Sequence, residues 1–225
     1  MSRIQEKINR SILVLGPPHS GKSVFSYLLF KLLRSQNDDT NLMDADYYSP
    51  TIDRRRMDRF YHQEERDFIT ITPNSKKLTE LTEANFRRVA HGIHEMIENE
   101  GFIIIDGLGR HTLSTESLLE ISNNLIIICS NNYCVEEIST ECNYLKEGTP
   151  LHPFEFYKSC KNNCIKIITY YDDKEVAFFK EDELYGELFN LNRNAISEGN
   201  IDRISIQTIA TIREIAKYII NNWRI

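Results

Sequence analysis

The chain has 225 residues, 41% of them hydrophobic and 27% charged, so it can bury a core large enough to fold without disulfides or a structural metal. Lys and Arg total 27 against 33 for Asp and Glu, a formal net charge of −6, which excludes a general basic surface for nucleic acid. Its apolar runs fall far short of the ~20 residues needed to span a bilayer, so we expect a cytoplasmic protein with no membrane partner.

The first predicted element is a buried strand, Ser11–Leu15, because its aliphatic residues run without alternation and end at a glycine. From Ser20 to Arg34 the apolar residues recur at helical spacing, and the stretch ends in the polar segment "SQNDDTN". The segment "GPPHSGKS" joins the two. The predicted order is therefore strand, glycine loop and helix.

This joining segment, Gly16–Ser23, matches the pattern G-x-x-x-x-G-K-[ST] in full and is called the phosphate loop below. Its glycines let backbone N–H groups point at phosphate oxygens, and the following helix N-terminus adds a favourable partial charge. Lys22 is expected to reach the β- and γ-phosphates, and the Ser23 hydroxyl to contact Mg²⁺. The predicted nucleotide contacts are Gly16, Pro17, Pro18, His19, Ser20, Gly21, Lys22, Ser23 and Val24, with no catalytic role for His19.

The next segment, "TNLMDADYYSP", predicts a short strand and then a turn, since Pro50 prevents regular continuation. Asp53–Asp67 is charge-dense and indicates a surface helix or an insertion, and we expect residues 51–77 to form an insertion or lid. An amphipathic helix is predicted from Thr82 to Asn99.

The rest of the chain continues the alternation of strands and helices. Unbroken apolar runs at Gly101–Gly107 and Asn124–Asn131 predict parallel strands covered on both faces. The other predicted elements are a crossover helix in "STESLLEIS", a helix at Val135–Lys146, a strand at Cys164–Tyr171, a peripheral strand pair near 174–191 and a closing helix at Ile206–Trp223.

Strands that alternate with helices predict a single α/β domain over residues 1–225, a three-layer P-loop NTPase sandwich whose mostly parallel central sheet is flanked by helices. Ligands of such sheets bind beyond the carboxyl ends of the strands. We therefore expect the phosphate loop, Asp44 with Asp46, and Asp106 at one edge of the sheet.

Asp106 ends the strand "FIIID", where a carboxylate holds Mg²⁺ directly or through water beside Ser23; the alternative is an Asp that only terminates a strand. No glutamate follows Asp106, which leaves the base for hydrolysis unassigned. The sequence "DGLG" satisfies the Asp-x-x-Gly pattern of GTPases, but no Asn-Lys-x-Asp segment occurs in the chain. ATP is therefore preferred over GTP.

Asp44 and Asp46 follow the second predicted strand, where small-molecule kinases place a carboxylate that activates the acceptor. Asp46 is the catalytic candidate, and the alternative is a turn-forming pair. Arg110 and the triplet Arg54–Arg56 are candidates for stabilising charge on the transferred phosphate, or else ordinary surface residues.

The wording "GPPHSGKSVF" resembles the AAA-like P-loop ATPase domain fused to cyclic-oligoadenylate ring nucleases in CRISPR type III loci. Asp46, the helix "LTEANFRRVAHGI" and the strands "FIIIDGLGR" and "NLIIICSN" follow in the same order, so the resemblance covers most of Ile12 to Tyr171. It implies ATP binding in antiviral defence, with a protein or cyclic-oligonucleotide partner. Gly107-Leu108-Gly109 replaces that family's paired glycines, and we expect no full ring nuclease domain before Ile12 or after Tyr171, so cleavage activity is not carried over.

Three functions fit these observations. The first is a Mg²⁺-dependent ATPase that acts as a regulatory or partner-binding module, with Asp106–Arg110 as its switch. The second is a small-molecule or nucleotide kinase that uses Asp46. The third is a nucleotide-binding scaffold without hydrolysis, an oligomer whose subunits complete the site in trans.

Overall fold

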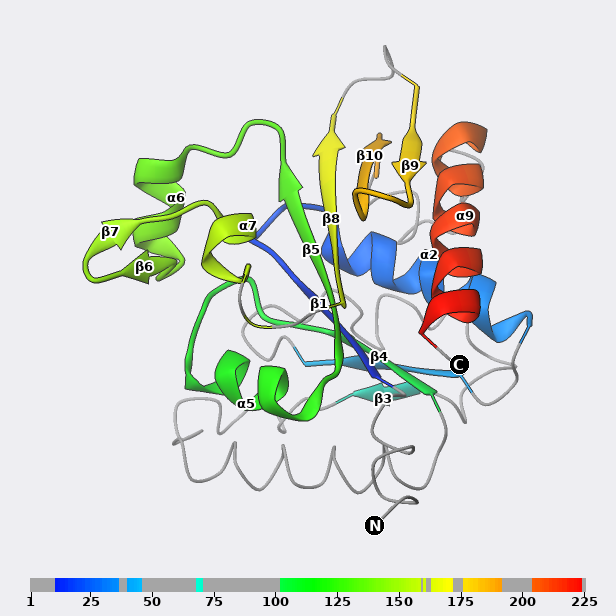
Figure 1. The fold of residues 1–225 in the computed structure, drawn as a ribbon, viewed down its shortest axis with the longest axis horizontal. Helices are drawn as coiled ribbons and strands as arrows, with labels where there is room; N and C mark the ends of the chain where they lie inside the picture. The colour runs from blue at the N-terminus through cyan, green and yellow to red at the C-terminus, as the bar shows by residue number, and fades with distance from the viewer. Residues whose placement is uncertain are drawn as a thin grey trace.

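The computed structural model describes residues 11–36, 40–45, 68–70, 102–158, 160, 163–171, 176–191 and 204–223. These residues build an α/β fold around a sheet in which seven strands are parallel and β9 alone runs antiparallel (Figure 1). The sheet order is β3 (Phe68–Thr70), β2 (Thr40–Asp44), β4 (Phe102–Asp106), β1 (Ser11–Leu15), β5 (Asn124–Ser130), β8 (Asn163–Tyr170), β10 (Tyr185–Phe189) and β9 (Phe178–Lys180).

Helices cover both faces of this sheet. On one face lie α2 (Lys22–Arg34) and α9 (Ile206–Asn222), which also contact each other. On the other lie α5 (Leu113–Ile121) and α7 (Pro153–Phe156) (Figure 1). The predicted three-layer sandwich with a mostly parallel sheet is thus confirmed.

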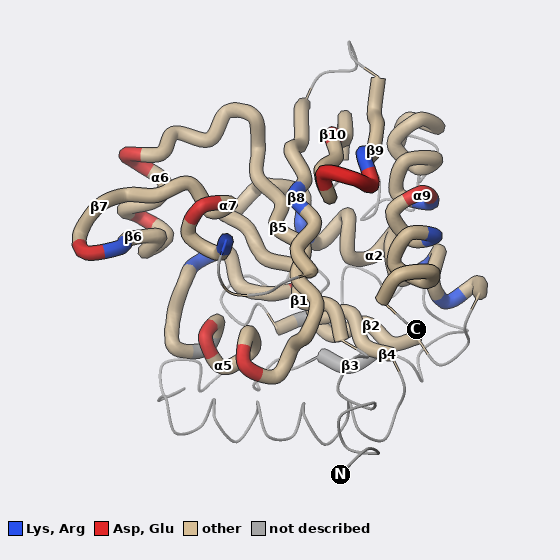
Figure 2. Tube along the Cα trace, in the orientation of Figure 1, with Lys and Arg blue, Asp and Glu red and all other residues tan. Residues whose placement is uncertain are grey.

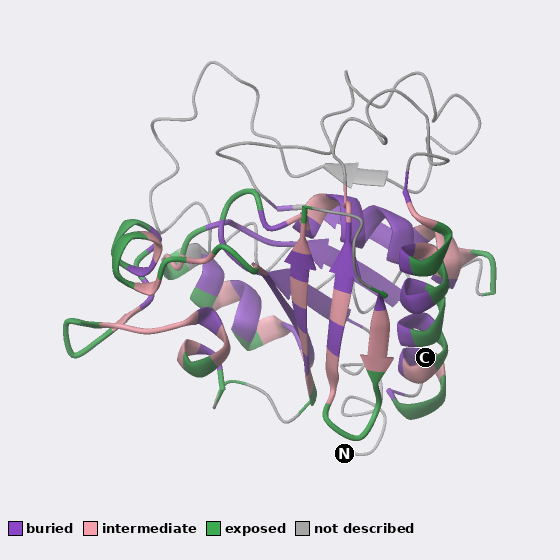
Figure 3. Ribbon diagram, turned by 90° about the horizontal axis from the view of Figure 1, so that it is seen from above, coloured by how far each residue is buried: buried purple, intermediate pink, exposed green. Residues whose placement is uncertain are grey.

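The central strand β1 shows why the sheet has two covered faces. Ile12 and Val14 belong to the core formed with α2 and α9, whereas Leu13 and Leu15 belong to the core formed with α5 and α7. Successive strand residues point to opposite faces, and both faces are apolar here. Burial of each such side chain contributes roughly 1.5–3 kcal/mol, and Figure 3 shows the central strands buried throughout their length.

Between β5 and β8 the chain leaves the sheet and forms a protruding lobe, residues 131–157 (Figure 1). The lobe contains α6 (Val135–Glu141), the short hairpin of β6 (Leu145–Lys146) and β7 (Thr149–Pro150), and α7. Figure 2 shows acidic positions on α5, on the lobe and in the turn between β9 and β10, whereas Lys and Arg positions are scattered over the described elements. No basic stripe therefore marks this part of the molecule.

The predicted helix Val135–Lys146 is wrong in its second half, because α6 ends at Glu141. Asn143 takes a left-handed conformation with φ 61°, which stops the helix. The next residue, Tyr144, is fully buried and packs its ring against Phe156 and Tyr157. The chain turns here because the Tyr144 ring is buried, and the amphipathic pattern of the segment does not predict that burial.

Several predictions concern residues that the structure does not describe. The helix Thr82–Asn99 lies outside the described residues, as do Asp46, Arg54–Arg56 and residues 51–77 apart from β3. Within 174–191 the described residues form the antiparallel pair β9 and β10 at the sheet edge. Among the described helices, none combines the length and apolar character needed to cross a bilayer.

Candidate functional site

The phosphate loop leaves the sheet at the end of β1, between β4 and β5, and its backbone requires glycine at both ends of the pattern. A Cβ on Gly16, which has φ 150°, would overlap the carbonyl oxygen of Ile128. Gly21 has φ 85° and caps α2, and a Cβ there would lie 3.1 Å from Leu191 Cδ1. The loop is therefore packed closely from both sides.

The N-terminus of α2 offers free backbone donors to an anion. No side chain caps this helix, and its first turn contains no acidic residue. By contrast, Thr112 caps α5 and Ser205 caps α9 through their hydroxyl groups. An uncapped helix start with its partial positive charge is well suited to a phosphate group.

Lys22 folds back over the loop that it follows. Its side chain is buried, and Nζ donates a hydrogen bond of 3.1 Å to the carbonyl oxygen of Pro17. The Ser20 N–H is directed to the same oxygen, at 3.4 Å. The ammonium group is thus held inside the loop.

Asp106 lies at the end of β4, beside α2. It is 1% exposed, and its Oδ1 accepts a hydrogen bond of 3.2 Å from the Ser26 hydroxyl. Ser26 is three residues after Ser23, so both hydroxyls lie on the same side of the helix. This arrangement ties the Asp106 carboxylate to the helix that carries Ser23.

The edge of the sheet near the loop brings β2, β4 and β1 together. Asp44 pairs with Asp106 in the parallel register, and the Ala45 N–H donates to the Asp106 carbonyl at 2.9 Å. The Gly107 N–H donates to the Val14 carbonyl at 2.9 Å. The loop, Asp44 and Asp106 share one edge, as expected, whereas Asp46 lies outside the described residues.

The residues present fit a magnesium-bound nucleotide. Mg²⁺ prefers oxygen ligands and binds through one or two carboxylates together with phosphate oxygens. The Ser23 hydroxyl and the Asp106 carboxylate supply such oxygens, and the curled loop and the uncapped α2 supply donors for the phosphates. No cluster of three metal-binding side chains occurs among the described residues, so nothing here indicates a transition-metal centre.

The segment after Asp106 touches the phosphate loop and the lobe. A Cβ on Gly109 would lie 3.0 Å from Pro18 Cγ and 3.2 Å from Pro18 N, so Gly109 packs against Pro18 with no room for a side chain. On the other side, the Tyr144 hydroxyl donates to the Gly109 carbonyl at 3.4 Å and Asn143 Nδ2 to the His111 carbonyl at 3.2 Å. The segment therefore bridges the loop and the lobe.

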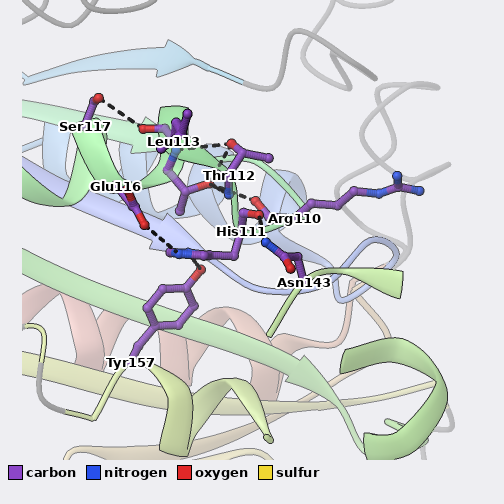
Figure 4. A network of polar contacts seen from close by, with 9 residues as sticks. Arg110, His111, Thr112, Leu113, Glu116, Ser117, Asn143 and Tyr157 are labelled. Carbon is purple, nitrogen blue, oxygen red and sulfur yellow. Dashed lines mark hydrogen bonds and ion pairs between the residues drawn. The ribbon is translucent and has the colours of Figure 1, made fainter. Parts of the chain in front are cut away.

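The His111 side chain is the centre of the contacts drawn in Figure 4. Its Nε2 lies 3.3 Å from Glu116 Oε1, and its Nδ1 lies 3.2 Å from the Tyr157 hydroxyl. Burial lowers the pKa of His111, while the nearby Glu116 carboxylate opposes this shift. A neutral ring with its proton on Nε2 satisfies both contacts.

Arg110 points away from the His111 ring in Figure 4 and forms an ion pair with Glu141 of α6 at 3.5 Å. Both side chains are more than half exposed, so the pair is weak. The Arg110 carbonyl accepts a 2.8 Å hydrogen bond from Thr115 Oγ1, which fixes the backbone here. A role for its guanidinium at a phosphate requires release from Glu141.

The sequence pattern does not identify three residues with hydroxyl groups that lie near the phosphate loop. Ser26 contacts Asp106, while Thr169 and Tyr171 from the end of β8 donate to carbonyls of the phosphate loop. For Ser26, the helical spacing of three from Ser23 is a usable signal. Thr169 and Tyr171 have none, because they lie 149 and 152 residues from their partners along the chain.

No family model matches the sequence, and no similar sequence is found among curated proteins. Solved structures do resemble the fold. A plasmid partition protein from Borrelia burgdorferi B31 bound to AMPPNP has 16% identity and a TM-score of 0.60, covering 94% of this chain and 98% of its own.

Two further structures share the fold over nearly their whole length. A ParA family ATPase from Chlorobium tepidum TLS has 16% identity and a TM-score of 0.53, with 92% of this chain and 97% of that chain covered. Cobyrinic acid a,c-diamide synthase from Mycobacterium smegmatis, with bound ADP and magnesium, has 11% identity, a TM-score of 0.57 and 95% coverage of both chains. At such identities the likeness shows the fold alone.

Proposed function

We propose that this chain is a Mg²⁺-dependent, ATP-binding P-loop NTPase that hydrolyses ATP. One observation carries the proposal: the segment Gly16–Ser23 curls at the edge of the sheet, Lys22 Nζ bonds back to Pro17, and the segment runs into an uncapped helix that begins at Lys22. Backbone donors, a held ammonium group and a helix N-terminus are the groups that bind a polyphosphate.

Each residue of the site has a separate task in this proposal. The N–H groups of the loop and of α2 bind the phosphate oxygens, and Lys22 exchanges its bond to Pro17 for the β- and γ-phosphates. Ser23 and Asp106 hold Mg²⁺, which neutralises phosphate charge when it is bound. Arg110 is the candidate for added charge stabilisation after it leaves Glu141.

The two nucleotide-bound neighbours support ATP as the ligand. The Borrelia protein holds AMPPNP, an ATP analogue, and the Mycobacterium synthase holds ADP and magnesium. Both share the fold of this chain, in which ligands bind at the carboxyl edge of the parallel strands. The phosphate loop and Asp106 lie at that edge here.

We further propose that the protein is a regulatory or partner-binding module whose switch is the segment Asp106–Arg110. Gly109 contacts Pro18 of the phosphate loop, and its carbonyl accepts from Tyr144 of the lobe. In this proposal, a change at the bound phosphates moves Pro18, and Gly109 passes that movement to Tyr144 of the lobe. In many nucleotide switches such a segment is ordered while the γ-phosphate is bound and is released after hydrolysis.

The narrower predictions rest on the sequence alone. A role in CRISPR-type antiviral defence, with a protein or cyclic-oligonucleotide partner, follows from the sequence of the loop, and the three structures compared above do not support it. The kinase alternative needs an acceptor site at Asp46, which lies outside the described residues. The scaffold alternative predicts retained nucleotide without turnover.

The proposal is tested by measuring phosphate release from Mg·ATP with the wild type, Lys22→Ala and Lys180→Ala. Lys180 is the matched control, a half-exposed lysine paired with Glu183 at the sheet edge. We expect turnover in the wild type and in Lys180→Ala, and at least a hundredfold less in Lys22→Ala, the order of loss seen when one charge-stabilising group is removed. Turnover that does not depend on Lys22, or its complete absence from the wild type, contradicts hydrolysis.

A further inference from the structure

We propose that Thr169 and Tyr171, at the end of β8, are positioning residues that hold the phosphate loop in its nucleotide-binding conformation. The inference rests on the proposed function and adds to it two residues that lie outside the loop motif. Thr169 Oγ1 donates to the carbonyl of Ser20 at 2.9 Å, and the Tyr171 hydroxyl donates to the carbonyl of His19 at 2.6 Å.

These two bonds reach across a neighbouring strand. The sheet order is β1, β5, β8, so β8 is not adjacent to the strand that carries the loop. Thr169 is 5% exposed and also lies 3.3 Å from the Cys129 carbonyl at the end of β5. Its hydroxyl thus sits where the ends of β5 and β8 meet the loop.

The direction of the two carbonyls determines the direction of the neighbouring N–H groups. In a trans peptide the C=O and the following N–H point to opposite sides. Bonds from Tyr171 and Thr169 draw the His19 and Ser20 carbonyls toward β8, so the N–H groups of Ser20 and Gly21 face the other way. The Ser20 N–H is directed to Pro17 O, within the loop's own backbone.

This orientation matters because a phosphate is an anion. Carbonyl oxygens carry partial negative charge and repel it, whereas N–H groups attract it. Lys22 Nζ and the Ser20 N–H bond to the same Pro17 oxygen, so this carbonyl is paired with two donors, while β8 holds the Ser20 and His19 carbonyls. The Thr169 and Tyr171 hydroxyls therefore hold the loop backbone in the orientation that phosphate binding requires.

The backbone at His19 shows that the loop needs such support. His19 has φ 62°, a left-handed conformation that is unfavourable for residues other than glycine. A hydrogen bond to its carbonyl offsets part of this cost. Tyr171 donates this bond although the residue as a whole is 63% exposed.

The test uses equilibrium binding of a fluorescent ATP analogue, mant-ATP, with Mg²⁺ to the full chain carrying Thr169→Val, Thr169→Ser or Tyr171→Phe. We expect about tenfold weaker binding for Thr169→Val and about threefold for Tyr171→Phe, the range that one hydrogen bond supplies. Thr169→Ser keeps the hydroxyl and restores wild-type affinity. Tyr185→Phe is the control, since its hydroxyl makes a bond of the same 2.6 Å to Glu187, away from the loop.

Binding stoichiometry separates positioning from folding. A positioning role changes the dissociation constant while the fraction of binding-competent protein stays the same. If Thr169→Val and Tyr171→Phe bind within twofold of the wild type, with or without a fall in the competent fraction, the proposal is overturned. A weakened dissociation constant that Thr169→Ser does not restore also overturns it.

Hydrogen exchange of the loop amides keeps the inference separate from the proposed function. If the wild type binds no mant-ATP, the ATP-binding proposal fails by itself. The positioning role is then judged from the nucleotide-free protein, where amides of Gly16–Ser23 exchange at least threefold faster in Thr169→Val and Tyr171→Phe. Unchanged exchange there overturns it.

Discussion

The Ser26 hydroxyl donates a 3.2 Å hydrogen bond to Oδ1 of Asp106, and both side chains are almost fully buried. The bond joins α2, one turn beyond Ser23, to the carboxyl end of β4. The packing of α2 against β4 thereby positions the two proposed magnesium ligands, Ser23 and Asp106. A substitution of Ser26 tests this hydrogen bond without replacing either proposed ligand.

We expect Ser26→Ala to lower the free energy of unfolding by about 1–2 kcal/mol, because a buried carboxylate loses a hydrogen-bond donor. Denaturant unfolding measures this value. Ser35→Ala is the control at the far end of the same helix, where the hydroxyl bonds to the Leu32 carbonyl at an exposed site. Equal effects of the two substitutions would contradict a special role for the bond to Asp106.

The glycine at the start of the phosphate loop is predicted to tolerate no side chain. Gly16→Ala places Cβ on the Ile128 carbonyl oxygen and should destabilise the fold by about 3 kcal/mol. Gly148→Ala is the comparison, since Gly148 has φ 79° with nothing within 4 Å of the added atom. Backbone strain alone should then cost about 1 kcal/mol. Thermal unfolding of both variants distinguishes steric overlap from strain, and equal losses would rule out the overlap.

Thr115 is predicted to hold the switch segment in place. Its Oγ1 donates to the Arg110 carbonyl at 2.8 Å and accepts from the Thr112 N–H at 3.2 Å, within the capping box of α5. Thr115→Val keeps the volume but removes both bonds, so we expect a loss of about 1–2 kcal/mol and faster amide exchange over residues 109–112. Ser117→Ala, on the same helix, should leave that exchange unchanged, and faster exchange in both variants would refute the assignment.

Stability is predicted to fall in acid through His111. Burial lowers the pKa of His111, so the unfolded chain binds more protons than the folded chain as the pH falls. The stabilising contribution is complete above the unfolded pKa of about 6.5 and is lost as the pH falls toward the lower folded value. Protonation also places a proton on Nδ1, opposite the Tyr157 hydroxyl.

The measurement is the free energy of unfolding of wild type and His111→Gln between about pH 5 and pH 7.5, the range in which histidine titrates. The slope should be smaller in the variant. His152 has a pKa lowered by burial as well, against the opposing Glu155, so His152→Gln should reduce the slope by a separate amount. Parallel curves for wild type and His111→Gln would show that His111 does not contribute.

Local sequence patterns were sufficient for most of the described elements. The runs at Ser11–Leu15, Phe102–Asp106 and Asn124–Ser130 are apolar without alternation, and each is a parallel strand with both faces covered. The helical spacing before Arg34 likewise predicted α2. Burial on one or both faces of an element gives its sequence a characteristic spacing of apolar residues. That spacing depends only on residues close together in the chain.

The prediction failed where distant packing overrides the local pattern. Val135–Lys146 reads as one amphipathic helix, yet Asn143 turns the chain so that Tyr144 enters the core beside Tyr157. No spacing within the segment records the position of Tyr157. Tyr157 lies outside the segment, and its ring is a neighbour of Tyr144 only in the folded structure.

The sequence alone determined that a phosphate loop connects a buried strand to a helix, because each step depends on residues a few positions apart. Only the tertiary structure decided that β8 lies two strands from β1, and so that Thr169 and Tyr171 reach the carbonyls of Ser20 and His19. Hydrogen bonds between residues so far apart depend on strand order. Strand order is determined by how all the helices and strands pack together, which no short pattern records.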